Sequence, residues 1–169
     1  REAPSYGSIM RQGYDELVNA IIRPPRAEYE VERLGPRDFS FCGERYVRKD
    51  LVLVNPRGLK LQCSHWLPRA PAAEPRPCVV FMHGNSSARL EGLNQLSVCL
   101  GFGFSLFSLD CAGSGRSEGK HVSLGFWEKD DLRVAVDHLR ASGTVSTIAV
   151  WGRSMGAVTA LLYQARDAE

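Results

Sequence analysis

Three short, almost wholly apolar runs constrain the fold more than any other feature of the sequence. Each run ends in a glycine-containing loop and is followed by a segment in which apolar residues recur at helical spacing. Continuous apolar strands are typical of a sheet covered on both faces, and alternation of strand and helix indicates parallel strands joined by right-handed crossovers. The sequence therefore predicts an α/β fold, a mostly parallel sheet with helices on both faces. The predicted strands are CVVFMHG (78–84), FGFSLFSLD (102–110) and STIAVWG (146–152), and the predicted helices are 88–100, 124–141 and 154–166.

An antiparallel hairpin is predicted before the first of these strands. Residues 47–54 and 59–67 have strand-like composition, and they flank an N-P-R-G turn at residues 55–58 with proline at its second position. The following segment, residues 68–77, is rich in proline and has no periodicity, so we expect an exposed connection there.

The N-terminal part of the sequence contains an amphipathic helical pattern over residues 9–22. Its apolar stripe is followed by RPPR at residues 23–26, where two prolines end the helix. We divide the chain into an N-terminal arm, residues 1–43, and the N-terminal half of a larger domain, residues 44–169. We expect the stripe to pack against that domain; a protein partner and a membrane surface are the alternatives, and the membrane surface is not favoured. The stripe consists of Met10, Tyr14, Leu17, Val18, Ile21 and Ile22.

Charge and cysteine content argue against several classes of function. The 21 Lys and Arg residues nearly balance the 19 Asp and Glu residues, so the charge does not favour a nucleic acid as partner. The 5 cysteines are odd in number and lack a C-x-x-C pair, which argues against a disulfide framework and against a zinc site. We therefore expect a cytoplasmic protein, with no apolar run of membrane-spanning length and no leader pattern.

The strongest chemical signal is the sequence G-x-S-x-G at residues 152–156, directly between an apolar strand and a helical pattern. In this setting a serine lies on a sharp strand-to-helix turn, its hydroxyl points outward, and the flanking glycines prevent collisions with strand and helix. The helix dipole favours negative charge that develops there. We predict that Ser154 is a nucleophile; the alternative is that it only caps a helix behind a tight turn. The motif residues around it are Gly152, Arg153, Met155 and Gly156.

A second element follows the first of the three strands, where the sequence reads His83-Gly84-Asn85. An enzyme with such a nucleophile needs a loop here that turns a backbone N–H toward the substrate carbonyl. We predict that the N–H groups of Asn85 and Met155 converge near the Ser154 hydroxyl as an oxyanion hole, in which one donor is worth about 10²–10³ in rate. His83 is expected to be a structural residue rather than the catalytic base. The residues expected to form the binding site around Ser154 are His83, Gly84, Gly152, Arg153 and Gly156.

A third element, residues 110–119, is a glycine-rich loop at the carboxyl edge of the predicted sheet, where α/β folds bind ligands. Asp110 can accept hydrogen bonds from N–H groups of this loop. The sequence leaves open whether the loop is purely structural or also contacts substrate. Asp110 precedes Ser154 in the chain, so we do not expect it to be the acid of a catalytic triad.

With these three elements the chain resembles the α/β-hydrolase family, and within it the serine-aminopeptidase-like or monoacylglycerol-lipase-like branch. The resemblance extends from about residue 19 to the end and includes IIRPPRAEY, VRKDL, LQCSH, HGNSS, LDCAGSGRSEG, EKDDL and WGRSMGAVTALLY. It implies an eight-stranded sheet, hydrolysis of an ester, thioester or amide through an acyl-enzyme on Ser154, and no metal or other cofactor. Among small-molecule acyl substrates we favour an ester or thioester over a peptide, because the charge is balanced and the arm is amphipathic.

The chain departs from the family pattern after the nucleophile. The family has the order nucleophile, acid, histidine, whereas only the carboxylates Asp167 and Glu169, and no histidine, follow Ser154. Loss of a triad member costs about 10⁴–10⁶ in turnover, so we expect residues 1–169 alone to be nearly inactive. We also expect the last strand, 146–152, to lie at an open sheet edge that invites association with later strands or a second chain.

Three hypotheses follow for the function of the chain. The favoured one is a serine hydrolase of which this chain is the N-terminal half. The others are a non-catalytic binding module that kept the turn around Ser154, and a structural partner of a separate chain that supplies the missing strands. A reading frame that continues past Glu169 into a strand, an aspartate loop and a late histidine would decide for the enzyme.

Overall fold

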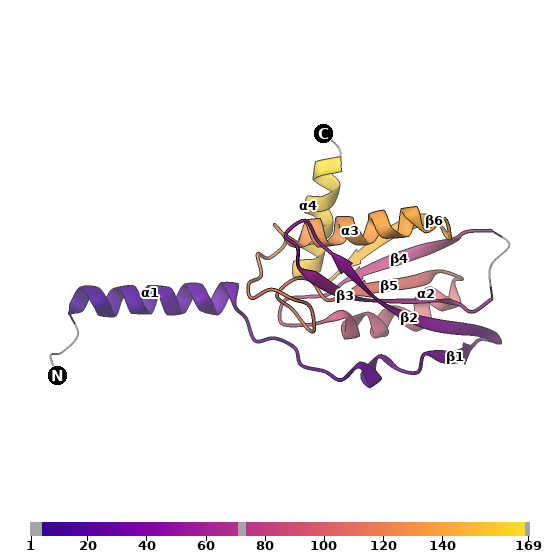
Figure 1. Cartoon of the computed structure of the whole chain (residues 1–169), viewed down its shortest axis with the longest axis horizontal. Coiled ribbons are helices and arrows are strands. Elements are labelled where there is room, and N and C mark those ends of the chain that lie inside the picture. Colours follow the sequence, from indigo (N-terminus) through magenta and orange to yellow (C-terminus); the bar gives the residue numbers. More distant parts are fainter. Residues whose placement is uncertain (1–4, 71–73, 168–169) are drawn as a thin grey trace.

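The computed structural model describes residues 5–70 and 74–167, which form a mixed sheet with helices on both faces (Figure 1). In these residues the sheet has six strands in the order β1-β2-β3-β5-β4-β6. The strands are β1 (Asp38–Phe41), β2 (Glu44–Val54), β3 (Lys60–Pro68), β4 (Arg76–Met82), β5 (Ser105–Leu109) and β6 (Val145–Gly152). The helices are α1 (Tyr6–Ile22), α2 (Leu93–Gly101), α3 (Glu128–Ala141) and α4 (Met155–Asp167), with short 3-10 turns η1 (Val31–Leu34) and η2 (Arg89–Gly92).

The strand directions make the sheet mixed, whereas the sequence predicted a mostly parallel one. β4 pairs in parallel with both β5 and β6, as the alternation of strand and helix indicates. β2 is antiparallel to β1 and β3, and β3 is antiparallel to β5. The antiparallel share is larger than predicted because β1 was not expected and because β3 joins the parallel strands through an antiparallel pair with β5. The predicted hairpin is confirmed, with Leu51 opposite Cys63 across β2 and β3.

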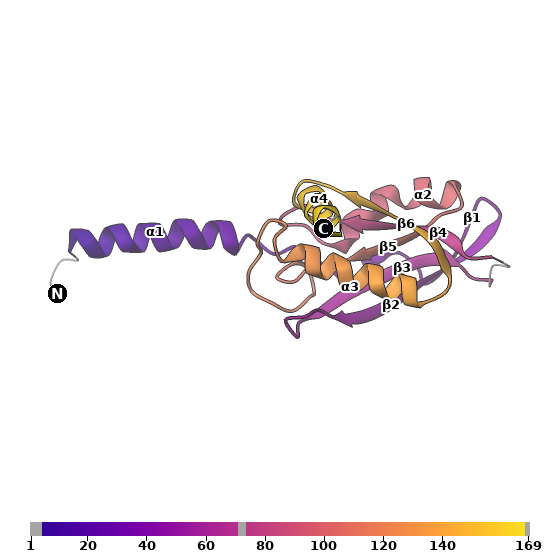
Figure 2. The same ribbon diagram turned by 90° about the horizontal axis from the view of Figure 1, so that it is seen from above.

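Two hydrophobic cores lie on opposite faces of the sheet and explain its continuous apolar strands. Val80 and Met82 of β4 pack in a core with α3 and α4 on one face. Val79 and Phe81 pack on the other face in a core that includes Cys99 of α2. Figure 2 shows α2 and α3 on opposite sides of the sheet. Because alternate side chains point to opposite faces, a strand that is covered on both faces is apolar throughout. Burial of each large apolar side chain stabilises the folded state by about 1.5–3 kcal/mol.

Helix α1 extends away from the sheet (Figures 1 and 2). It is amphipathic, as predicted, but none of its residues is buried, and Tyr14 and Leu17 are 67% and 61% accessible. The expectation that the stripe packs against the domain was therefore wrong. Pro24 and Pro25 hold the chain extended after the helix, so α1 does not fold back at this point. None of the described helices is both long enough and apolar enough to span a bilayer.

The rest of the arm, by contrast, is held against the sheet. Arg26 donates hydrogen bonds to two carbonyl oxygens of loop 110–119, at 3.0 and 2.6 Å. Tyr29 and Leu34 are buried in the core on the α2 face, and β1, which the sequence did not predict, pairs with β2. The arm predicted over residues 1–43 is thus joined to the sheet along its second half.

β6 lies at an edge of the sheet, and among the described strands it pairs only with β4. Its side chains are partly covered, and Trp151 is 43% accessible. Helix α4, which follows, exposes Leu161 to 72%. An edge strand with free hydrogen-bonding groups and uncovered apolar side chains favours pairing with another strand. The β6 edge is therefore the place where the sheet can be extended.

Candidate active site

Ser154 occupies a sharp turn between β6 and α4, which we call the serine turn (residues 152–156). Its φ of 50° lies in the left-handed region, which residues with a side chain rarely adopt. Helix α4 begins directly after Ser154, whose carbonyl oxygen accepts a hydrogen bond from Ala157 N at 2.9 Å. Ser154 is exposed, whereas Met155 is buried. A strained backbone between strand and helix is the geometry in which hydrolases present a nucleophilic serine.

The two glycines of the serine turn leave no room for a side chain. A Cβ on Gly152 would lie 2.2 Å from Gly156 O, and a Cβ on Gly156 would lie 2.1 Å from Met82 O. Both distances are far shorter than van der Waals contact between the atoms. The first turn of α4 therefore lies directly against the end of β4, and only glycine permits this approach.

This close packing brings the loop after β4, the donor loop (residues 83–85), next to the serine turn. Arg153 N donates a hydrogen bond to Met82 O at 3.1 Å. Met155 is the first residue of α4, so its N–H belongs to the helix end that has no partner within the helix. The convergence of the Asn85 and Met155 N–H groups on one point stays a prediction, and the contact between β4 and α4 is compatible with it.

His83 is fully buried, and the backbone uses both of its ring nitrogens. Nδ1 lies 2.7 Å from Gly84 O, and Nε2 accepts a hydrogen bond from Cys111 N at 3.1 Å. These partners require the neutral ring with its proton on Nδ1, and burial lowers the pKa of His83 below its ordinary value. His83 thus ties the donor loop to the loop after β5, and neither nitrogen is free to act as a base for Ser154.

Glu91, which the sequence analysis did not single out, connects the donor loop to the serine turn. Its Oε2 accepts a hydrogen bond from Gly84 N at 3.0 Å, and its Oε1 accepts one from Arg153 Nε. The Arg153 guanidinium lies so close over Gly84 that a Cβ there would be 2.7 Å from Nη2. Glu91 lies on η2, and no short motif marks it, because its position beside Arg153 arises only when the chain is folded.

Asp110 fixes the conformation of the glycine-rich loop after β5. Its carboxylate is completely buried. Oδ1 accepts a hydrogen bond from Arg89 N at 2.6 Å. Oδ2 accepts hydrogen bonds from Arg116 N at 2.9 Å and from Tyr29 Oη at 2.6 Å. A Cβ on Gly115 would lie 2.4 Å from Asp110 Cγ, so the loop wraps the carboxylate closely. The prediction that Asp110 accepts loop N–H groups is confirmed, and its burial separates it from any substrate.

Asp131 of α3 supports the same loop from the other side. Its Oδ2 accepts a hydrogen bond from Ala112 N at 2.8 Å, and its Oδ1 accepts one from Asn55 Nδ2 at 2.7 Å. Burial raises the pKa of Asp131 above its ordinary value, and the hydrogen bonds from Ala112 and Asn55 act against this shift. The EKDDL segment thus contributes a structural anchor for the loop.

The part of the chain that the structure describes contains no hydrogen-bond partner for the Ser154 hydroxyl. Its histidines have other surroundings: His83 is used by the backbone, His121 accepts from an arginine of the arm at 2.9 Å, and His65 of β3 and His138 of α3 both lie beside the ring of Phe107. The described residues also contain no group of three or more His, Cys, Asp or Glu side chains that could hold a metal ion. The serine turn therefore presents an exposed serine hydroxyl, and no base for it lies among these residues.

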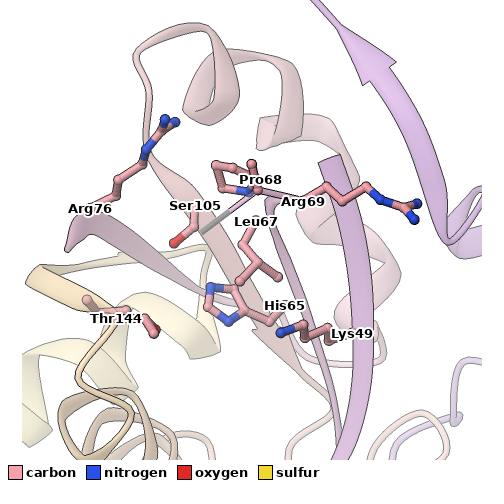
Figure 3. Close-up of a pocket in the computed structure, with 10 residues that line it drawn as sticks. Lys49, His65, Leu67, Pro68, Arg69, Arg76, Ser105 and Thr144 are labelled. Carbon is pink, nitrogen blue, oxygen red and sulfur yellow. The ribbon is translucent and has the colours of Figure 1, made fainter. Parts of the chain in front are cut away.

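A separate cavity of about 230 Å³ (Figure 3) lies at the end of the sheet where the parallel strands β4, β5 and β6 begin. Its walls include Arg76 and Ser105, the first residues of β4 and β5, whereas the serine turn begins at the last residue of β6. The guanidinium groups of Arg69 and Arg76 point away from it and pair with acidic residues of β1 and β2. The lining residues are Lys49, His65, Leu67, Pro68, Arg69, Ala70, Arg76, Ser105, Thr144 and Val145.

Acid is expected to destabilise the protein through His65, which lines this cavity. Burial, together with repulsion from His138 and Lys49, lowers the pKa of His65 from 6.5 to about 4. The unfolded state therefore binds the proton at a higher pH than the folded state does. The contribution of neutral His65 to the free energy of unfolding is fully present above about pH 6.5 and is lost as the pH falls from there to about 4. The loss is about 3 kcal/mol for a shift of this size.

Urea unfolding of the complete protein at a series of pH values measures this loss. A His65→Phe variant keeps a planar ring beside Phe107 and should show a pH dependence that is flatter by about 3 kcal/mol across this range. His121→Gln, a change in a loop histidine, serves as the control and should keep the native slope. Equal slopes for His65→Phe and the native protein would show that His65 is not the group responsible.

Comparison with known proteins gives one family match and several related structures. The family described as serine aminopeptidase, S33, matches residues 73–169. The uncharacterized protein YqkD of Bacillus subtilis is 38% identical over 86 residues, which are 50% of this chain and 28% of YqkD. The Pyrococcus furiosus esterase Pf2001 superposes with a TM-score of 0.63 at 23% identity, over 83% of this chain and 52% of the esterase. Est1E from Butyrivibrio proteoclasticus, solved with ferulic acid bound, has a TM-score of 0.59 at 21% identity, over 70% of this chain and 48% of Est1E.

These relatives are considerably longer than the present chain, which spans about half of Pf2001 and of Est1E and 28% of YqkD. The structural similarities show the shared fold, and the family match covers more than half of the sequence. The resemblance inferred from the sequence motifs is thereby confirmed. The chain belongs to the serine aminopeptidase S33 family of the α/β-hydrolase superfamily and covers part of that fold.

Proposed function

We propose that the complete protein is a serine hydrolase that forms an acyl-enzyme on Ser154. The observation that carries the proposal is the backbone of Ser154, with φ at 50° between two glycines that admit no Cβ. Such a conformation costs about 1–3 kcal/mol and persists where the surrounding structure imposes it, often at active sites. Membership of the S33 family and a fold shared with the Pyrococcus furiosus esterase Pf2001 support the same class of reaction.

In the proposed reaction, Ser154 Oγ attacks the carbonyl carbon of an acyl ester or thioester while a histidine base accepts its proton. The carbonyl oxygen becomes an oxyanion, to which the N–H groups of Asn85 and Met155 donate hydrogen bonds. The leaving alcohol or thiol takes the proton from the histidine, and the acyl group stays on Ser154. Water then gives a proton to the same histidine as it attacks the acyl carbonyl; the bond between the acyl carbon and Oγ breaks, the histidine returns the proton to Oγ, and the acid is released.

The histidine and its acid are proposed to come from polypeptide beyond the described residues. In α/β-hydrolases they follow the nucleophile in chain order, and this chain spans only 52% of Pf2001 and 48% of Est1E. The open edge of β6, together with the exposed Trp151 and Leu161, is where further strands would pair and pack. A second polypeptide that supplied these strands would complete the same site.

The reaction class is tested by kinetics of the complete protein on p-nitrophenyl acyl esters and on aminoacyl p-nitroanilides. We expect higher kcat/KM for the acyl esters, because the charge is balanced and the exposed stripe of α1 suits an apolar acyl group. Faster cleavage of the anilides would reverse the substrate preference and keep the serine mechanism. Absence of hydrolysis in both series would contradict the proposed function.

A second candidate, a non-catalytic binding module, is supported by the cavity beside His65, which lies at the end of the parallel strands opposite to Ser154. In that case the complete protein would bind a small molecule in this cavity without turnover. The continuation of the reading frame past Glu169 separates the two candidates. A strand, an aspartate loop and a later histidine favour the hydrolase, whereas their absence favours the binding module.

A further inference from the structure

We propose that Glu91 is a positioning residue that fixes the position of the Asn85 N–H relative to Ser154; this inference rests on the proposed function, in which that N–H binds the oxyanion. Glu91 belongs neither to the serine turn nor to the donor loop. Its carboxylate accepts hydrogen bonds from Gly84 N, at 3.0 Å, and from Arg153 Nε. A single carboxylate therefore connects the loop that carries one candidate oxyanion donor to the turn that carries the nucleophile.

The planarity of the peptide unit explains how Gly84 controls the Asn85 N–H. In a trans peptide unit the C=O and the following N–H lie in one plane and point in opposite directions. Gly84 C=O and Asn85 N–H belong to the same unit, so the direction of the carbonyl sets the direction of the donor. Gly84 O is held by His83 Nδ1 at 2.7 Å and by Ser87 N at 3.2 Å.

Glu91 holds the other peptide unit that flanks Gly84, the one to which Gly84 N–H belongs. A glycine has the widest range of backbone conformations, so an unrestrained Gly84 would let the two units rotate relative to each other. Glu91 on the N–H side and His83 on the C=O side together remove this freedom. Without Glu91 the first unit is released from the serine turn, and the Gly84–Asn85 unit, still held by His83 and Ser87, can move relative to Ser154.

Glu91 can act in this way because its own support is rigid. It lies on η2, whose first residue, Arg89, donates its backbone N–H to the buried Asp110 at 2.6 Å and its Nε to Tyr29 Oη at 2.8 Å. The Glu91 side chain is 12% accessible and that of Arg153 is 58% accessible. The arginine thus shelters the carboxylate from solvent, and hydrogen bonds to an ionised, sheltered acceptor are stronger than neutral ones.

Kinetics of the complete enzyme on an acyl ester distinguish positioning from substrate binding. We expect Glu91→Leu, which removes both contacts, to lower kcat by about 10²-fold with little change in KM, because an oxyanion donor acts mainly in the transition state. Glu91→Gln keeps a carbonyl oxygen that can accept from Gly84 N, so its kcat should recover to within about tenfold of the native value. Glu74→Leu removes an exposed carboxylate near the start of β4 and is the matched control, with native kcat expected. Equal losses of kcat in Glu91→Leu and Glu91→Gln, or an increase in KM with kcat unchanged, would overturn the inference.

The role of Arg153 is measured in a double-mutant cycle. If the arginine acts only by sheltering and orienting Glu91, the double variant Glu91→Leu/Arg153→Met should be no slower than Glu91→Leu alone. Additive losses in kcat would mean that the two residues act independently, and the bridge between the donor loop and the serine turn would be refuted.

Nuclear magnetic resonance of the isotope-labelled complete protein tests the orientation without turnover. In Glu91→Leu we expect amide exchange at Gly84 to accelerate by about 10²-fold and the Asn85 amide resonance to shift, whereas Glu91→Gln should resemble the native protein. Unchanged Gly84 and Asn85 amides in Glu91→Leu would overturn the inference whether or not the enzyme is active. If the amides of Glu91→Leu respond as expected but the native protein hydrolyses no ester, the proposed function is contradicted and the structural role of Glu91 stands.

Discussion

Replacement of Ser154 by alanine is expected to lower kcat of the complete protein on an acyl ester by about 10⁴–10⁶. The acyl group has no other acceptor once Oγ is removed, so chemistry stops although substrate still binds and KM changes little. Ser154 is exposed, and alanine has the same backbone restriction at φ 50° as serine. We therefore expect the free energy of unfolding to stay within about 0.5 kcal/mol of the native value.

Steady-state kinetics with a p-nitrophenyl ester measure this effect, and Ser97→Ala is its control. Ser97 is an exposed serine on α2 and takes no part in the candidate site, so its variant should have native kcat. Turnover by Ser154→Ala within tenfold of the native enzyme would rule out Ser154 as nucleophile.

A methyl group at Gly156 is expected to have the largest effect on folding. Its Cβ would lie 2.1 Å from Met82 O and 2.9 Å from His83 O, which are backbone atoms of the sheet and the donor loop. Either α4 moves away from β4 or the strand end shifts, and we expect Gly156→Ala to lower the free energy of unfolding by more than about 3 kcal/mol. The same movement separates Asn85 from Met155, so kcat of the remaining folded enzyme should fall as well.

Urea unfolding of the complete protein gives the size of this effect, with Gly101→Ala as the matched control. A Cβ on Gly101 would meet no atom within 4 Å, and this glycine ends helix α2. Alanine there should be neutral or stabilising by up to about 1 kcal/mol, because it favours the helix. Similar small changes in both variants would contradict the close approach of α4 to β4.

The C-terminal part of the fold could be predicted from the sequence because burial on both faces of a strand leaves an uninterrupted apolar run. The strand predicted over 146–152 and the helix predicted over 154–166 correspond to β6 (Val145–Gly152) and α4 (Met155–Asp167). Glycines at the strand-to-helix turn marked their boundary. The serine turn could be located for the same reason, since the residues that shape it are neighbours in sequence.

The N-terminal part could not be predicted in the same way. β1 has 4 residues, too few for an alternating pattern to be recognised, and it becomes a strand by pairing with β2. An amphipathic pattern such as that of α1 specifies an apolar face but not what covers it. The expectation of packing against the domain failed for that reason, and the stripe is exposed.

The contacts that support the candidate site were also beyond reach of the sequence, because they join residues far apart in the chain. Glu91 and Arg153 are separated by 62 positions, and Tyr29 and Asp110 by 81. No local periodicity or motif relates such pairs, and their meeting depends on how η2 and the arm pack on the sheet. His83 is the exception, because its strand-end position already indicated a structural role.

The central claim, that Ser154 is the nucleophile, is tested most directly by labelling the complete protein with a fluorophosphonate and mapping the adduct by peptide mass spectrometry. The serine oxygen displaces fluoride from phosphorus, so only an activated hydroxyl is modified rapidly. We predict an adduct on the peptide that contains Ser154, retained in Ser97→Ala and absent from Ser154→Ala. An adduct that persists in Ser154→Ala, or one that maps to another residue of the native protein, would contradict the account.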